Sequence, residues 1–177
     1  MNIFRLDNDP HLAATMAINK HIVKMPPESC QLLHTALRQF GCTADWLYKP
    51  FNPKHPSCLW VRESRSNFKW LVRHGKALCA EYTTRYGKVY KCSPLIDRAE
   101  CESHLIPDGP ETKQLLAMPD QFRHDDVVHS YKIYYAAAKF RFAKWKTSQP
   151  YWWDEYRALV KARGLEVEND KNDGVKV

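Results

Sequence analysis

The chain has 177 residues and a mass of 20.8 kDa, and 44% of its residues are hydrophobic, which is typical of one globular domain with its own core. Lys and Arg outnumber Asp and Glu by 27 to 20, so the formal charge of +7 weakly favours a polyanionic partner. No apolar run reaches the ~20 residues of a membrane span, and the N-terminus does not resemble a secretory signal. We therefore expect a cytoplasmic protein with no membrane contact.

The N-terminal part of the chain is predicted to form two helices. Asp9-Pro10 is typical of a helix start, and the apolar spacing that follows predicts a helix to about Met25. Pro26-Pro27 is expected to end this helix and to begin the next one, over residues 28–39. Residues 42–55 are predicted to form a loop, because they contain three turn-forming residues, Pro50, Asn52 and Pro53.

The rest of the chain is predicted to add three further helical stretches. His55-Pro56 opens the first, and Ser64 restarts it as a long helix that ends at about Tyr86. Residues 88–125 carry four prolines and are predicted to be irregular. Two helices follow, over 127 to about 146 and from Pro150 onward.

The fold class predicted from these elements is all-α, because no segment alternates convincingly with period 2. We expect a compact multi-helical bundle that forms a single domain over residues 1–163, with one long irregular segment. Residues 164–177 are polar and are expected to be a disordered tail. A monomer is slightly favoured over an oligomer.

The six cysteines do not follow a metal-binding pattern. No Cys-x-x-Cys is present, and the nearest grouping, Cys92, Cys101 and His104, fits none of the usual zinc spacings. We therefore expect buried, reduced thiols, no metal site and no cofactor.

The first candidate site lies where the first predicted helix meets the second. Lys20, His21 and Lys24 come out on one side of the first helix, and Glu28 opens the next helix at the corner. Lysine offers positive charge or an amine, and a histidine with a carboxylate can transfer protons. A solvated basic helix face is the alternative, with about the same weight.

The second candidate is a stretch that interleaves aromatic with basic residues. It contains His55, Trp60, Arg62, Arg65, Asn67 and Lys69. Because aromatic rings stack on bases and arginines reach phosphates, this mixture is typical of nucleic-acid binding. Core aromatics on one helix face and solubilising charges on the other are the alternative, and for any single aromatic residue that alternative is stronger.

Two further regions add candidates for nucleic-acid binding. Arg85 and Lys88 lie at the end of the long helix, where Arg85 either lines a site or only forms a helix-surface ion pair with Glu81. Tyr151 and Trp152 belong to an aromatic cluster that forms either a wall for a base or a satellite of the core. Motifs of serine hydrolases, zincins, dinucleotide enzymes and calcium loops are absent from the sequence.

The combination of these motifs resembles two phage families. Over about residues 1–153 the chain is similar to a family of small tailed-phage proteins of uncharacterised activity. The residues that carry this similarity are Asp9-Pro10, 20–25, Glu28, 31–33, His55-Pro56-Ser57, Trp60, Arg62, Glu81-Tyr82, 85–88, Met118-Pro119, Tyr131, Tyr134-Tyr135, Lys139, Trp145 and Pro150. The chain also resembles, more distantly, the phage pyrimidine-dimer DNA glycosylases of the endonuclease V type. This likeness rests on its first predicted helix and on residues 118–123 and 150–152.

The glycosylase resemblance implies an all-α enzyme that breaks the glycosidic bond through a Schiff base between an amine and the sugar, assisted by a glutamate. In that family the amine is the α-amino group of a small residue exposed after Met1 is removed. Asn2 is too large for the usual removal of Met1, so we expect Met1 to stay. His21 stands where the family's helix carries its glutamate, and the nearest carboxylate is Glu28, beyond the two prolines.

The leading hypothesis is a phage DNA-processing hydrolase, similar to DNA N-glycosylases, that acts on a damaged or modified base in the host cytoplasm. Lys20 and Lys24 hold phosphate or supply the amine, His21 and Glu28 transfer protons, and Arg62, Arg65 and Lys69 follow the backbone of a flipped or kinked substrate. One alternative is an enzyme of free nucleotides or of thymidine-type base modification. The other is an accessory protein that binds nucleic acid without catalysis.

Overall fold

A computed structural model of the protein describes residues 2–167. The described residues form seven α-helices and no strand, so the all-α prediction is confirmed. The helices are α1 (Pro10–Thr15), α2 (Asn19–Gln39), α3 (Pro56–Glu63), α4 (Arg65–Tyr86), α5 (Ser93–Cys101), α6 (Val127–Ala138) and α7 (Trp153–Ala162). Short 3₁₀ turns span Glu102–Leu105, Asp120–Phe122 and Phe140–Phe142. Within this part of the chain, no helix is long and apolar enough to cross a membrane.

Several helix ends follow from local sequence. The Asp9 carboxylate accepts hydrogen bonds from the first turn of α1, and the Ser64 hydroxyl accepts one from Asn67 N at the start of α4. Gly87 ends α4 with a positive φ of 66°, a conformation that favours glycine. The predicted restart at Ser64 and the predicted end of α4 are therefore confirmed.

The break between the first two helices differs from the prediction. The chain leaves the helical path at residues 16–18, and α2 then runs through Pro26-Pro27 to Gln39. Distant groups satisfy the backbone at the break: Arg85 donates to Thr15 O and Ala17 O, and Trp145 Nε1 donates to Met16 O. The prediction of one helix to Met25 is wrong because these bonds come from far along the chain.

The proline pair is accommodated inside α2. Pro27 cannot donate the hydrogen bond that Val23 O would receive in a regular helix. The Tyr90 hydroxyl donates to Val23 O instead, at 2.5 Å. Because the helix continues, Glu28 lies one turn beyond Lys24 on the same helix, and not in a separate one.

Two other predicted boundaries are corrected. The segment 88–125 contains a helix of its own, α5, whose Ile96 and Ala99 are buried. Helix α6 ends at Ala138 and not near residue 146, because the chain turns there into the 3₁₀ segment Phe140–Phe142. The part of this segment that follows α5, from residue 102 on, is irregular apart from two 3₁₀ turns, as predicted.

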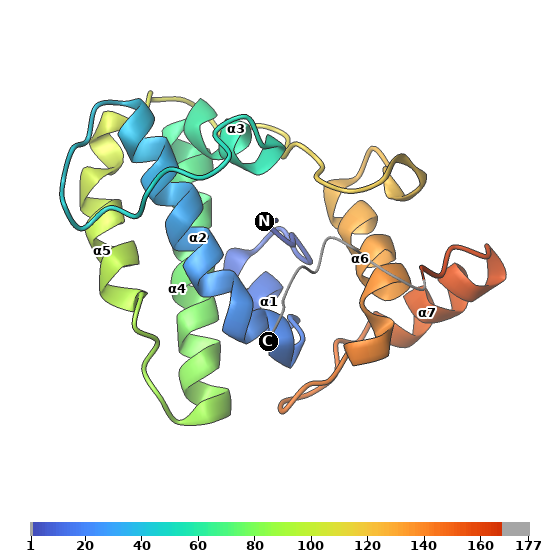
Figure 1. Ribbon diagram of the computed structural model, residues 1–177. Coiled ribbons are helices and arrows are strands. Elements are labelled where there is room, and N and C mark those ends of the chain that lie inside the picture. Colours follow the sequence, from blue (N-terminus) through green and yellow to red (C-terminus); the bar gives the residue numbers. More distant parts are fainter. Residues whose placement is uncertain (1, 168–177) are drawn as a thin grey trace.

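The N-terminal segment lies between α2 and α6, as Figure 1 shows. Phe4 stacks on His21 of α2, with ring centres 4.4 Å apart, and also contacts Tyr134 of α6. On the other side of α2, the long helix α4 packs against α1, α2, α3 and α5. The two sides have separate buried clusters, and α2 contributes residues to both.

The chain returns to α6 after α7. Val167 N donates to Ala137 O at 3.0 Å, and Arg157 pairs with Glu166. The expected tail begins at residue 164, and its residues 168–177 lie outside the described part of the chain. The division into one domain over 1–163 and a tail stays a prediction.

Candidate active site

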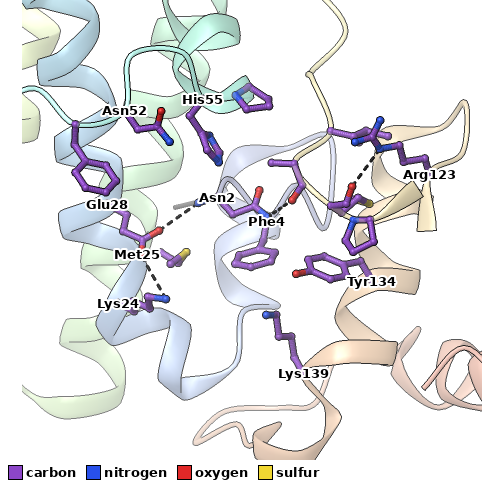
Figure 2. Close-up of a pocket in the computed structure, with 16 residues that line it drawn as sticks. Asn2, Phe4, Lys24, Met25, Glu28, Asn52, His55, Arg123, Tyr134 and Lys139 are labelled. Carbon is purple, nitrogen blue, oxygen red and sulfur yellow. Dashed lines mark hydrogen bonds and ion pairs between the residues drawn. The ribbon is translucent and has the colours of Figure 1, made fainter. Parts of the chain in front are cut away.

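A pocket of about 480 Å³ opens where the N-terminal segment, α2, the loop before α3, residues 116–123 and α6 meet (Figure 2). Its polar lining includes Lys24, Glu28, His55, Arg123 and Lys139. A concave site in which polar groups converge beside apolar walls is typical of a small-molecule or base-binding pocket. The site is therefore built from elements that are far apart in the sequence.

Lys24 and Glu28 form one wall of the pocket. They are one helical turn apart on α2, and Lys24 Nζ lies 3.5 Å from Glu28 Oε1. Both side chains are mostly buried, with about a fifth of each exposed (20% and 17%). An amine and a carboxylate are thus brought together, and such a pair can exchange a proton.

The main chain of Asn2 contacts the same carboxylate. Asn2 N donates to Glu28 Oε2 at 3.2 Å, and Asn2 Nδ2 donates to Ala117 O at 2.9 Å. Tyr131 donates its hydroxyl to Asn2 Oδ1 at 2.9 Å, and burial raises the pKa of Tyr131 to about 12, so this donor stays protonated. These bonds fix the N-terminal segment against Glu28.

The opposite wall is aromatic and carries a second cation. Phe4 and Tyr134 line the pocket, and Lys139, at the end of α6, is only 1% exposed. Lys139 Nζ lies 5.1 Å from the centre of the Tyr134 ring and 5.7 Å from that of Phe4. Figure 2 shows Lys139 beside these rings. This wall combines the apolar surface that a base prefers with a positive charge.

Three polar residues lie at the edge of the pocket. His55 caps α3, accepting from Ser57 N, and burial lowers its pKa. Arg123 is exposed, and its Nε donates to Met118 O at 3.2 Å. Asn52 belongs to the loop before α3. His55 is the one predicted nucleic-acid contact in the lining of this pocket.

The other two predicted catalytic residues lie outside the pocket lining. His21 is 1% exposed, packs under Phe4, and shares a hydrogen bond of 2.7 Å between its Nδ1 and the Tyr135 hydroxyl. Lys20 Nζ lies 4.2 Å from the centre of the Phe142 ring. The structure thus brings together Lys24 and Glu28 but not His21 and Glu28.

Most of the candidate residues in the aromatic–basic stretch 55–70 form hydrogen bonds within the protein. Trp60 is fully buried and its Nε1 donates to Thr112 O. Asn67 is also buried and donates to Trp60 O. Arg65 donates to the carbonyls of residues 103, 104 and 106. Arg62 Nη1 donates to Gln39 Oε1, and Lys69 is exposed on α4.

The remaining predicted contacts are also away from the pocket. Arg85 is buried, with its Nε 2.9 Å from Glu81 Oε2, so the pair stabilises the break between α1 and α2 and does not line the site. Lys88 is exposed beyond the end of α4. Tyr151 is 81% exposed, whereas its neighbour Trp152 is buried against Met16.

The cysteines lie mainly in the interior. Cys30, Cys58, Cys79 and Cys92 are buried, and burial raises the pKa of Cys58 to about 11. Cys101 and His104, members of the grouping weighed as a zinc site, are exposed. Among residues 2–167, no three potential metal ligands come close enough to hold an ion.

The lining residues that were not predicted as site residues include Asn2, Phe4, Arg123, Tyr134 and Lys139. Local patterns give no signal for them, because they come from the N-terminal segment, an irregular segment and α6. Tyr134, Lys139 and Arg123 do occur in the stretches on which the family resemblances depend. That resemblance is the one signal in the sequence that points to them.

Comparison with known proteins identifies the family of the chain. Residues 1–93, more than half of the chain, match the family model described as pyrimidine dimer DNA glycosylase, and this range contains Lys24 and Glu28. No curated protein and no solved structure matches the chain. The match confirms the resemblance to the glycosylases and supports a DNA glycosylase function in general, with DNA as the substrate. The chain therefore belongs to the pyrimidine dimer DNA glycosylase family.

Proposed function

We propose that the protein excises a damaged pyrimidine base from duplex DNA and that Glu28 is the acid–base residue of the reaction. The observation that carries the proposal is the convergence on Glu28: Lys24 Nζ lies 3.5 Å from one carboxylate oxygen and Asn2 N lies 3.2 Å from the other. A carboxylate between two nitrogens, at the edge of a pocket, suits the transfer of a proton between an attacking amine and a departing base.

In this proposal Lys24 supplies the amine, because Asn2 favours retention of Met1. Glu28 takes a proton from the Lys24 ammonium, and the neutral Nζ attacks C1′ of the deoxyribose. A bond forms between Nζ and C1′ as the bond from C1′ to the base breaks. The base leaves with that electron pair and receives the proton from Glu28. The bond from C1′ to O4′ then breaks, a proton passes from the attacking nitrogen to O4′, and the C=N bond that forms is the Schiff base.

The pocket also suits the substrate. Its volume of about 480 Å³ lies within the range of ligand pockets and is sufficient for one extrahelical nucleotide. Phe4 and Tyr134 offer aromatic surface for the base, with the buried Lys139 beside their rings, and the exposed Arg123 offers positive charge for a flanking phosphate. His21, buried beneath Phe4, is assigned a supporting role and not proton transfer.

The test uses labelled duplexes that are undamaged, ultraviolet-irradiated or abasic, with and without borohydride. We expect release of base and a trapped covalent band on irradiated duplex, and we expect Glu28→Gln to slow release by about 10²- to 10⁴-fold. Glu155→Gln, an exposed change on α7, is the matched control. A Glu28→Gln variant that releases base at the wild-type rate would overturn the assignment.

Mass spectrometry of the trapped product then identifies the amine. We expect the sugar remnant on the peptide that contains Lys24. A remnant on the N-terminal residue assigns the amine to the start of the chain and leaves the role of Glu28 in place, because Asn2 N contacts the same carboxylate.

The pocket also favours one other candidate, an enzyme of free nucleotides, because its volume matches a single nucleotide. Protection against thermal unfolding by a nucleotide, with none by duplex DNA, supports that candidate. Steeply salt-dependent binding of duplex without any product supports the accessory-protein alternative.

A further inference from the structure

The loop before α3 carries an exposed aromatic residue at the edge of the pocket. Its sequence is Lys49-Pro50-Phe51-Asn52-Pro53-Lys54, with the aromatic residue between two prolines and a lysine near each end. Phe51 lines the pocket that contains Glu28, yet 51% of Phe51 is exposed. Both lysines are exposed as well. Neither the core nor the proposed chemistry uses this group.

The backbone on both sides of Phe51 is fixed to the rest of the protein. Phe51 N donates to Thr35 Oγ1 of α2 at 3.2 Å, and Phe51 O accepts from Cys58 Sγ of α3 at 3.7 Å. Just before it, Arg38 donates to the carbonyls of Leu47 and Tyr48. The exposed ring therefore projects from an anchored backbone and not from a loose loop.

The next residue is held in an unfavourable conformation. Asn52 has a φ of 44°, the one positive φ of a non-glycine residue in the described part of the chain, and it precedes a proline. Asparagine adopts the left-handed region more readily than most non-glycine residues, but the following proline disfavours it. Asn52 O accepts from His55 N at 2.9 Å, so the turn is also closed by a hydrogen bond. Such strain persists where the surroundings enforce it, often at ligand-binding segments.

We propose that Phe51 is a wedge that stacks within a base step of duplex DNA opened beside the pocket, while Lys49 and Lys54 contact phosphates on its two sides. The inference rests on the proposed function, since it takes duplex DNA as the substrate. Apolar side chains inserted between bases unstack a step and bend the duplex, and a rigid wedge loses little conformational entropy on insertion. Phe51 thereby makes the enzyme selective for a nucleotide within a duplex.

The first measurement is fluorescence of 2-aminopurine placed beside the lesion, which increases when the base is unstacked and requires no turnover. We expect an increase with wild type and with Phe51→Trp, which preserves an aromatic ring, and none with Phe51→Ala. Phe40→Ala is the matched control, because Phe40, at the end of α2, is also an exposed aromatic residue, at 37%, but does not line the pocket.

The second measurement compares base release from a full duplex with release from a duplex that has a gap opposite the lesion, where the step is already open. On the full duplex, Phe51→Ala is expected to lower kcat/KM by about 10- to 100-fold, the size of a stacking contact. On the gapped duplex it is expected to match wild type. Lys49→Ala and Lys54→Ala are each expected to reduce the salt dependence of binding by about one phosphate contact, whereas Lys161→Ala on α7 is not.

The outcomes separate the wedge from the proposed function. A fluorescence increase that persists in Phe51→Ala overturns the wedge, even if base is released normally. A wild-type protein that leaves the probe stacked also overturns it. An increase that depends on Phe51, in a protein that releases no base, supports the wedge and overturns the glycosylase proposal.

Discussion

Two regions of the molecule contain the same kinds of side chain and use them differently. In the stretch 55–70, Arg65 and Trp60 donate to backbone carbonyls, and Asn67 bonds to Trp60 O. Around the pocket, Lys24 and Glu28 face a cavity, and Phe51 is half exposed at its edge. An interleaved pattern of aromatic and basic residues therefore indicates a function only when its hydrogen bonds are not already used within the fold.

The first prediction has the largest expected effect and concerns the pocket. Lys24→Gln should abolish the trapped band and slow base release by about 10⁴-fold, as expected for loss of a nucleophile, without lowering the melting temperature much. Lys20→Gln, one turn earlier on α2, is the contrast because Lys20 lies over Phe142 and outside the pocket lining. If Lys20→Gln slows base release as much as Lys24→Gln does, the assignment of the amine to the pocket residue is wrong.

The second prediction concerns the internal region. Arg85→Met should lower the free energy of unfolding by about 4 kcal/mol, because Glu81 loses its buried partner and the carbonyls of Thr15 and Ala17 lose their donor. Urea denaturation followed by circular dichroism measures the change, with the exposed Lys88→Met as the control. If Arg85→Met unfolds like Lys88→Met, the proposed role at the α1–α2 break is wrong.

The third prediction uses pH to examine the same interior. His74 is buried in α4, its Nδ1 lies 2.9 Å from Pro10 O, and burial lowers its pKa to about 4. Because the unfolded chain takes up a proton on this residue near pH 6.5 and the folded chain does not, stability is complete above pH 6.5 and falls as pH decreases toward 4. The loss from this residue is about 3 kcal/mol.

Urea titrations at several pH values measure this slope. His74→Gln, which retains a donor for Pro10 O, should show a shallower decrease between pH 6.5 and 4. A variant with the wild-type slope would assign the acid sensitivity to other groups, of which His34 is one, since burial also lowers its pKa.

The fourth prediction has the smallest effect and compares the regions most directly. Arg65→Gln should lower the free energy of unfolding by about 2 kcal/mol, because it removes charge-assisted bonds to three carbonyls. The dependence of duplex binding on salt should stay as in wild type. A salt slope reduced by about one phosphate would show that Arg65 contacts DNA as well.

The helices were predictable where their signals are local. The Asp9 and Ser64 caps and the glycine at residue 87 lie next to the ends that they determine. The break at residues 16–18 was not predictable from local sequence, because its carbonyls receive hydrogen bonds from the distant residues Arg85 and Trp145. Likewise, the continuation of α2 through Pro26-Pro27 depends on a hydroxyl 67 residues away from the carbonyl it serves.

The candidate site was predictable only where its residues lie close together in the sequence. Lys24 and Glu28 were both selected as candidates, with Glu28 expected in a separate helix at the corner, and their contact follows instead from the continuity of α2. His21, three residues before Lys24, was selected with them, but its ring is buried in a stack with Phe4. Lys139 could not be found from spacing, because only the packing of α6 against the N-terminal segment brings it to the pocket.

The hydrogen bond from Tyr90 to Val23 has a consequence for how α2 transmits motion. The two prolines leave a gap in the helix's own hydrogen bonding just before Glu28, so the helix consists of two halves with a joint between them. Tyr90 closes that joint from outside the pocket. The direction in which the Glu28 carboxylate faces the pocket thus depends on a tyrosine that lies outside the pocket lining.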